Sequence, residues 1–376
     1  MSEARPLDDA DLDALRASEG IALAVTTRPY VEYATVDSMR NFARSYGDDN
    51  PLFGDEDYGR MSRWGSMVAP PLFPIGSGIP VLAPAEPGAI VRHALRGVAV
   101  TVLTDRWTLN HWVRPGARLV RADSIAAVGV EETVTAPTVV ITTRSAYTEG
   151  DVLYATHDRV RVHGGRSIAD ADDAREGKAT YDDGVIAEID QAIAAWQRRG
   201  SAKFDARTIK AGQQIGPMVK GPLTVTDLVA YRGGVGPGPF GVEPLDLARL
   251  NRIERPDFYD RDDTGAWDAR ERLHWDEAYA QRCGHPSAYD YTHTRLNWMV
   301  HLLTDWMGDN GRIEAISFDH SKHNYVGDTH WIDGIVREVR ASDDDVSVDI
   351  GLRGVNQLGV ETCQGEATVA FTELGR

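Results

Sequence analysis

The spacing of hydrophobic residues predicts amphipathic helices at equivalent places in the two halves of the chain. One helix is predicted over 36–46, because its apolar residues recur at the i, i+3, i+4, i+7 intervals of a helix face. These residues are Met39, Phe42, Ala43 and Tyr46. A similar helix is predicted from Val225, where Thr224 and Asp227 have the spacing of a capping box. Each helix is followed by a second helical stretch, 55–64 in the first half and 277–283 in the second.

Apolar and polar residues then alternate over long stretches, which is typical of half-buried antiparallel strands. In the first half the predicted strands cover 21–25, 107–112, 118–128, 134–147 and 152–162. In the second half they cover 313–318, 329–339, 346–355 and 365–371, behind a longer helix over 295–307. The order of elements is therefore repeated. We expect two copies of one α+β unit, with the site at the seam between them.

The pattern also divides the chain into domains. We expect an N-terminal domain over 1–164, a linker with a helix over 165–205, and a C-terminal domain over 206–376 that carries the site. The linker helix, 185–199, has isoleucines on one stripe, which we expect to pack across the junction. The second copy holds an extra stretch, 233–270, with a start rich in Gly and Pro. It is expected to be a long, mobile loop that covers the site.

Composition and charge narrow the class of protein. The 376 residues carry a net charge of −17 and give a pI near 5.1, which argues against nucleic acid or an anionic membrane as partner. The two cysteines cannot build a disulfide framework, so a reducing cytoplasm is expected. The chain shows neither an apolar leader segment nor a run long enough to span a membrane. We therefore expect a cytoplasmic globular protein.

Two partial motifs indicate the chemistry. The first helix runs into Gly47-Asp48-Asp49-Asn50-Pro51-Leu52-Phe53, and the second half contains Leu273-His274-Trp275-Asp276. With Val68-Ala69-Pro70-Pro71, these strings resemble the MaoC-like family of enoyl-CoA hydratases and 3-hydroxyacyl dehydratases, whose N-terminal dehydratase domain the first half resembles. The resemblance implies a double hot-dog fold, in which two antiparallel sheets each wrap around a long helix.

Both copies depart from that family's motif, Gly-Asp-x-Asn-Pro-Leu-His-x-Asp, in which the first Asp and the His hold the reacting water. The first copy keeps Asp48 and Asn50 but has Phe53 in the place of the His. The second copy keeps His274 but has Ala269 in the place of the catalytic Asp. The family's Gly that serves the thioester oxygen is here Thr292.

The addition of water to an enoyl thioester needs a base, an acid and a donor for the enolate oxygen. The resemblance implies His274 as the acid–base group, with Asp276 or Asp290 as its carboxylate; Glu271 and Asp268 are alternatives. The turn with Tyr289, Tyr291 and Thr292 is expected near the thioester carbonyl. Phe53, Asp48 and Asn50 are expected to bind the acyl portion, although Asp48 and Asn50 also suit turn caps.

The resemblance implies CoA or a carrier-protein pantetheine as the substrate's handle, a homodimer, and no cofactor. A metal is not expected either, because His320, His323 and His330 lack a tight ligand spacing. Two other interpretations stay open. A hot-dog protein with these losses is also compatible with lyase, isomerase or cyclase chemistry on a non-thioester intermediate, or with a non-catalytic binding partner. A carboxylate bonded to His274 would favour an enzyme, and cationic residues at the pocket would favour a thioester.

Overall fold

The computed structural model describes residues 8–25, 29–77, 100–131, 138–164, 178–236, 243–254, 256–342 and 345–372. The strands of the first half are β1 (Ala22–Val25), β2 (Val100–Leu109), β3 (Val120–Glu131), β4 (Thr138–Glu149) and β5 (Val152–His163). Those of the second half are β6 (Gln214–Lys220), β9 (Arg312–His320), β10 (His330–Ala341), β11 (Asp345–Asn356) and β12 (Glu361–Thr372). A two-stranded sheet is formed by β7 (Tyr259–Arg261) and β8 (Trp267–Ala269).

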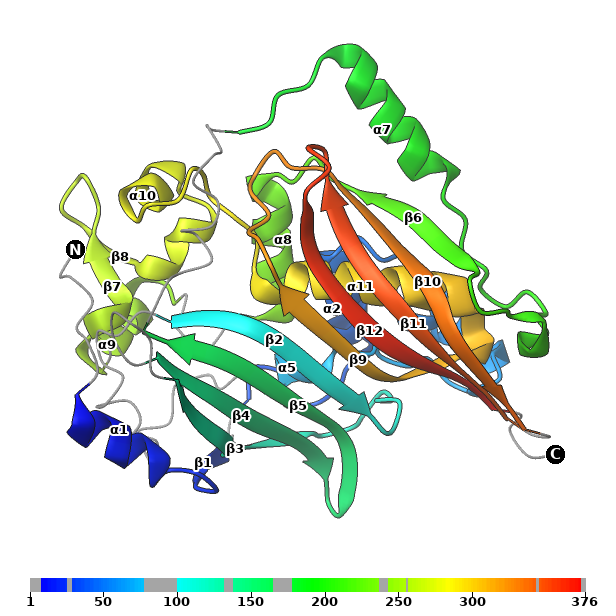
Figure 1. Cartoon of the computed structure of the whole chain (residues 1–376), viewed down its shortest axis with the longest axis horizontal. Coiled ribbons are helices and arrows are strands. Elements are labelled where there is room, and N and C mark those ends of the chain that lie inside the picture. The colour runs from blue at the N-terminus through cyan, green and yellow to red at the C-terminus, as the bar shows by residue number, and fades with distance from the viewer. Residues whose placement is uncertain are drawn as a thin grey trace.

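The ten long strands form one antiparallel sheet with the order β1-β3-β4-β5-β2-β9-β12-β11-β10-β6 (Figure 1). Counted from its two edges, this order is the same: β1-β3-β4-β5-β2 matches β6-β10-β11-β12-β9. The duplicated α+β architecture expected from the sequence is thus confirmed. The two half-sheets join along β2 and β9, where Asp105 lies opposite Phe318 and Trp107 lies opposite Ile316. Residues of both halves therefore share one face at the seam.

The central helix of the second half is α11 (Thr292–Met307), which begins three residues before the predicted start. It packs against β6, β9, β10 and β11 and lies behind the strands of the second half (Figure 1). Polar residues on it are buried together with the apolar ones, including Arg295, His301 and Asp305. A helix buried all round is the core of its sheet. In the first half, the stretch 78–99 before β2 lies outside the described residues.

Two other helices meet where the halves touch. They are α2 (Val36–Ser45) and α8 (Val225–Val235), and they pack against each other. The predicted capping box of Thr224 and Asp227 is confirmed. The helix α2 is capped by Thr35, and Ser38 completes its capping box.

The expectation of a long loop over 233–270 is wrong. Its first residues complete α8, and α9 (Leu245–Glu254), the β7–β8 hairpin and the 3-10 helix η4 (Arg270–His274) follow; 237–242 and 255 lie outside the described residues. A Cβ on Gly234 would meet the carbonyl oxygen of Asn41 at 2.4 Å. This glycine therefore lets α8 approach α2 closely. In the sequence, a glycine that permits close helix packing looks the same as a glycine that marks a loop.

The remaining elements are short. They are α1 (Asp9–Arg16), α3 (Pro51–Gly54), α4 (Glu56–Met61), α5 (Pro74–Ser77), α7 (Asp183–Ala195) and α10 (Glu277–Arg282). The helix α7 packs against β6, but of the predicted stripe Ile189 is buried while Ile193 is 43% exposed. Within the described ranges, no helix is both long and apolar enough to cross a membrane.

Candidate functional site

A cavity of about 260 Å³ lies where the start of β2, the end of β9 and the N-terminus of α11 meet. Four of its lining residues are histidines, namely His274, His285, His320 and His323. Its other polar walls come from Thr101, Tyr289, Asp290, Thr292, Arg295 and Lys322. Of the residues that the sequence placed in the site, His274, Tyr289, Asp290 and Thr292 line this cavity together. Its walls come from both halves of the chain.

His274 is held by the main chain and not by a carboxylate. Its Nδ1 lies 2.9 Å from the carbonyl oxygen of Tyr289, and since a carbonyl only accepts, Nδ1 carries the hydrogen and donates it. The ring packs against Tyr291 at 4.2 Å between centroids. Burial lowers the pKa of His274 to about 3, which keeps the imidazole neutral. Its Nε2 then carries a lone pair that can take a proton.

The two carboxylates expected to pair with His274 are engaged elsewhere. Asp290 accepts from Arg295 Nε at 2.9 Å and from Asn324 Nδ2 at 3.1 Å; burial raises the pKa of Asp290 although Arg295 opposes this. Asp276 caps α10 by accepting from the backbone N–H of Tyr279 at 3.0 Å. In the described part of the chain, neither forms the expected pair with His274.

The N-terminus of α11 lies at the cavity. Thr292 is the first residue of this helix and lines the cavity, and the residue before it, Tyr291, gives the helix no side-chain cap. The first N–H groups of a helix have no partner inside the helix, and with the helix dipole they bind negative charge. Backbone N–H groups need no glycine for this, so Thr292 is compatible with the role that the family's Gly has.

Asp105 is a site residue that the sequence did not reveal. It lies on β2, is fully buried, and accepts from Arg159 Nε at 2.7 Å. His157 Nε2 lies 2.6 Å from its Oδ1, and His320 Nε2 lies 3.1 Å from its Oδ2. Burial alone would raise the pKa of Asp105, but Arg159, His293 and His157 hold it well below its usual range. Because His320 lines the cavity, Asp105 is the carboxylate directly behind its wall.

The motif residues of the first half lie in the core and not on the cavity. Asp48 accepts from the backbone N–H of Asn50 at 2.9 Å, and Asn50 caps α3 by accepting from Leu52 at 3.0 Å. Phe53 is fully buried in an apolar cluster and lies 6.3 Å from the ring of Trp112. The acyl-binding role expected for these three residues therefore has no cavity to serve in the described structure.

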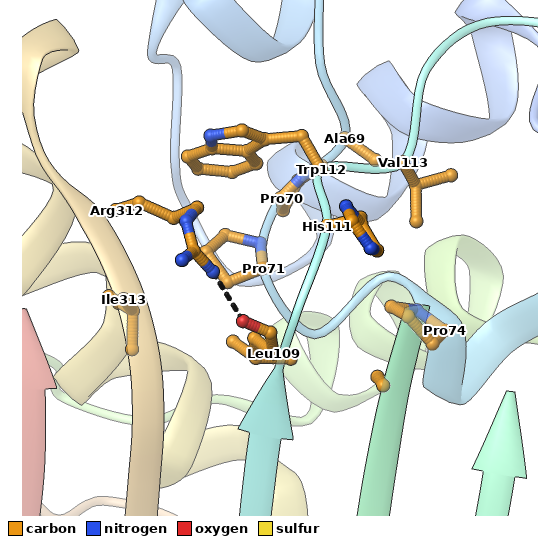
Figure 2. A pocket seen from close by; sticks show the side chains of 11 residues that line it. Ala69, Pro70, Pro71, Pro74, Leu109, His111, Trp112, Val113, Arg312 and Ile313 are labelled. Atoms are coloured by element: carbon orange, nitrogen blue, oxygen red, sulfur yellow. Dashed lines mark hydrogen bonds between the residues drawn. The ribbon is translucent and has the colours of Figure 1, made fainter. Parts of the chain in front are cut away.

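Two other hollows are lined by fewer groups that could transfer a proton. At the opposite end of the β2–β9 seam, Pro70 and Pro71 line a niche of about 10 Å³, beside Arg312 donating to the carbonyl of Leu109 (Figure 2). This space holds no more than one water. An open depression of about 910 Å³ lies beside Lys203 and Phe371. No histidine lines it.

Two clusters of buried side chains have the composition of metal ligands. They are Asp105, His157 and His293, and Asp48, His301 and Asp305. Each cluster already contains a cation: Arg159 bonds Asp105, and the ammonium of Lys220 lies 2.8 Å from Nδ1 of His301. A fixed cation repels a divalent metal, so these donor sets fit ion pairing better. His320, His323 and His330 do not form such a cluster in the described part of the chain, where His330 bonds Thr362.

Comparisons with known proteins agree with this architecture. Residues 25–156 match the sequence profile described as the FAS1-like dehydratase domain region. A solved MaoC-like dehydratase is similar in fold with a TM-score of 0.61 at 14% identity, over 95% of this chain and 99% of the other. No curated protein matches the chain in sequence.

Two further solved structures have the same fold. A MaoC-like dehydratase from Phytophthora capsici gives a TM-score of 0.53 at 13% identity, over 97% of this chain and 99% of the other. A conserved Mycobacterium tuberculosis protein with a double hot-dog fold gives 0.52 at 13%, over 95% and 97%. The fold is thus a double hot-dog. The predicted fold is therefore confirmed: the chain has the fold of the solved MaoC-like dehydratases, and part of its first half resembles a dehydratase domain region in sequence.

Proposed function

We propose that this protein interconverts enoyl and 3-hydroxyacyl thioesters by adding or removing water in the 260 Å³ cavity. The observation that carries the proposal is that His274 and the N-terminus of α11 line the same cavity. One supplies a lone pair for a proton, and the other supplies N–H donors for an oxyanion. These are two of the three groups that the reaction requires.

In the hydration direction, Nε2 of His274 takes a proton from water while the water oxygen bonds to the β-carbon. Negative charge then develops on the thioester oxygen, which the first N–H groups of α11 stabilise. The bond from Nδ1 to the Tyr289 carbonyl fixes the tautomer that this step needs. The enolate must finally receive a proton at its α-carbon, which requires a second group.

Other residues of the predicted site shape the cavity in this proposal. Tyr289 and Tyr291 pack against the His274 ring and restrict its orientation. Asp290 is held by Arg295, whose NH1 also donates to the carbonyls of Lys322 and Thr362, so this ion pair fixes the wall beside the thioester. Lys322 also places positive charge at the cavity, whereas the charge of Arg295 is balanced by Asp290. Such charge suits the phosphate of a CoA or pantetheine handle.

A second candidate is supported by the lining itself. Four histidines and two cations make the cavity polar, which suits a polar intermediate better than an acyl chain. Lyase, isomerase or cyclase chemistry on a non-thioester substrate would use the same lone pair on His274. A third interpretation is a non-catalytic binding module. It is favoured by the observation that, among the described residues, His274 bonds a main-chain carbonyl and not a carboxylate.

The test is turnover of enoyl-CoA and enoyl-pantetheine substrates of several chain lengths, followed by loss of the conjugated enoyl absorbance. His274→Ala should lower kcat by roughly 10²–10⁴-fold, the usual size of an acid–base contribution. His111→Ala is the matched control, because His111 is exposed and lies at the opposite end of the seam. If the folded wild-type protein turns over none of these thioesters, the proposal fails and the non-thioester candidate takes its place.

We also propose that the chain works as a cytoplasmic homodimer without nucleic acid or membrane as partner. The net charge of −17 supports the exclusion of polyanions. The edge strands β1 and β6 offer unpaired backbone groups to a second copy. Light scattering after size-exclusion chromatography should give about twice the chain mass of 41.3 kDa. A monomer would contradict the dimer without affecting the chemistry.

A further inference from the structure

We propose that Asp105 of the first half orients His320 of the second half, and that this pair is the cavity's second proton-transfer group. This inference rests on the proposed function, for which it supplies the proton at the α-carbon. It also assigns the carboxylate that the second copy's motif lacks, and places it on a strand of the other copy. Asp105 would be a positioning residue, and His320 the group that faces the substrate.

The register of the seam brings the two residues together. Asp105 lies directly opposite Phe318, and His320 is two residues further along β9, so all three side chains lie on one face of the sheet. Oδ2 of Asp105 is 3.1 Å from Nε2 of His320. An ionised carboxylate only accepts, so Nε2 carries the hydrogen and Nδ1 keeps its lone pair. In the described structure, Nδ1 has no hydrogen-bond partner, and His320 lines the cavity.

Asp105 is fixed and charged by groups on its other side. Arg159 and His157, both on β5, reach Oδ1 at 2.7 and 2.6 Å. The ring of His157 stacks on Trp107 at 4.1 Å, and Arg159 also contacts His293. The carboxylate is therefore ionised and immobile before any substrate enters. A preorganised negative charge behind an imidazole stabilises its protonated form.

The two histidines then divide the proton transfers. In hydration, Nε2 of His274 takes the proton that water loses as the C–O bond forms at the β-carbon. His320 is neutral at rest, so its Nδ1 first takes a proton from solvent, and the charge of Asp105 stabilises the imidazolium. The electron pair of the enolate then forms the C–H bond with this proton. His320 ends neutral again, and His274 ends protonated and returns its proton to solvent. Dehydration is the reverse sequence, and no further reactant is required.

The experiment combines a spectroscopic and a kinetic measurement on the full chain. Long-range ¹H–¹⁵N spectra of the ligand-free protein, with His320 assigned by comparison with His320→Gln, should show the Nε2–H tautomer. In Asp105→Asn the population should shift toward Nδ1–H, and kcat should fall by roughly 10²-fold or more with KM nearly unchanged. Asp319→Asn is the matched control. Asp319 lies on the same strand beside His320 and bonds Thr104 instead.

The outcomes separate the possible failures. An Nδ1–H tautomer of His320 in the wild type, or a folded Asp105→Asn protein with unchanged kcat, would overturn the pairing. If Asp105→Asn does not fold, His320→Ala decides, because added imidazole should restore part of its turnover. Full kcat in folded His320→Ala overturns the role of the pair. If no thioester is turned over at all, the proposed function fails, while the tautomer still tests the contact between Asp105 and His320.

Discussion

The two halves of this molecule keep different remnants of one motif and use them in opposite ways. In the first half, Asp48 is sealed into a buried ionic cluster with Arg198, His301 and Asp305. In the second half, His274 lines an open cavity and bonds only the carbonyl of Tyr289 among the described residues. A duplicated fold can therefore bury one copy of a motif in its core and place the other on a cavity.

The surroundings of the two copies explain the difference. Phe53 stands where the family has a histidine, and it completes an apolar cluster with Leu52 and Val68. None of the three cavities described above is lined by Leu52, Phe53 or Val68. In the second half the segment from Leu245 to His274 folds into α9, a hairpin and η4, which bring His274 beside Tyr289. The same point in the fold is closed in one copy and open in the other.

Two buried carboxylates of the first half show the same contrast in their electrostatics. Burial raises the pKa of Asp48, and the negative charge of Asp305 adds to this, although His301 and Arg198 oppose it. Asp105 is buried as deeply, but Arg159 and its histidines hold its pKa well below the usual range. Burial alone therefore does not decide charge; the neighbours do. Only Asp105 contacts a residue of the cavity wall.

The strongest test of this difference between the halves is to substitute one motif residue in each half. His274→Ala should lower kcat by roughly 10²–10⁴-fold with little change in the melting temperature. Asp48→Asn should instead lower the free energy of unfolding by about 0.5–2 kcal/mol, because it acts as a capping and ion-pairing residue. Turnover of one thioester and thermal melts are measured on both proteins. A dead but well-folded Asp48→Asn protein would move the chemistry into the first half.

Acid titration should separate the buried histidines from Asp48 by the sign of their effect on stability. Burial lowers the pKa of His274 and His157 to about 3 and that of His320 to about 4, against 6.5 for a free histidine. Between pH 6.5 and about 4 the unfolded chain binds more protons at these residues, so stability falls as the pH falls. Each group contributes about 1.4 kcal/mol per pH unit in that window. The raised pKa of Asp48 acts in the opposite direction.

The measurement is urea unfolding between pH 7 and pH 4.5. His274→Gln and His320→Gln should each remove about one proton from the uptake that accompanies unfolding. Asp48→Asn should leave the uptake by the histidines in place. An unchanged slope in both histidine variants would show that these imidazoles are not neutral in the folded protein.

Much of the fold could be predicted because it depends on local patterns. The long strands and the central helix were found from alternation and length, and the capping box at Thr224 from three-residue spacing. The edge strand β6 was missed, since Gly216 and Pro217 interrupt its pattern and proline is typical of edges. Gly234 suggests a loop in the sequence, because its close packing against α2 depends on residues that are distant along the chain.

The site was predictable only where one segment carried it. His274, Tyr289, Asp290 and Thr292 lie within 19 consecutive positions, and the motif around them identified all four. Asp105 and His320 are brought together by the register of two strands that are 215 positions apart. A single sequence holds no signal for that register. The motif therefore points to carboxylates near His274 in the sequence, whereas Asp105 and His320 lie on opposite sides of the seam between the halves.

Restoring the family's histidine in the first half tests whether packing has closed that copy. Phe53→His places an imidazole in a fully buried apolar cluster without a partner, which should cost about 1–3 kcal/mol of unfolding free energy. It should not restore turnover in a His274→Ala background. Phe53→Leu is the control, since it keeps the site apolar. Recovery of activity by Phe53→His would show that the first half still holds a working site.

The smallest expected effect concerns Asp276, the carboxylate that the motif placed beside His274. In the structure it caps α10 by accepting from the N–H of Tyr279. Asparagine caps a helix about as well as aspartate, so Asp276→Asn should leave both kcat and the melting temperature nearly unchanged. Asp276→Ala loses the cap and should cost about 0.5–2 kcal/mol, again with kcat retained. The two variants thus separate the capping role of Asp276 from the role of its charge. A large fall in kcat for folded Asp276→Asn would mean that this charge serves His274 during turnover. The catalytic carboxylate would then be Asp276 of the second half's own motif, and not Asp105.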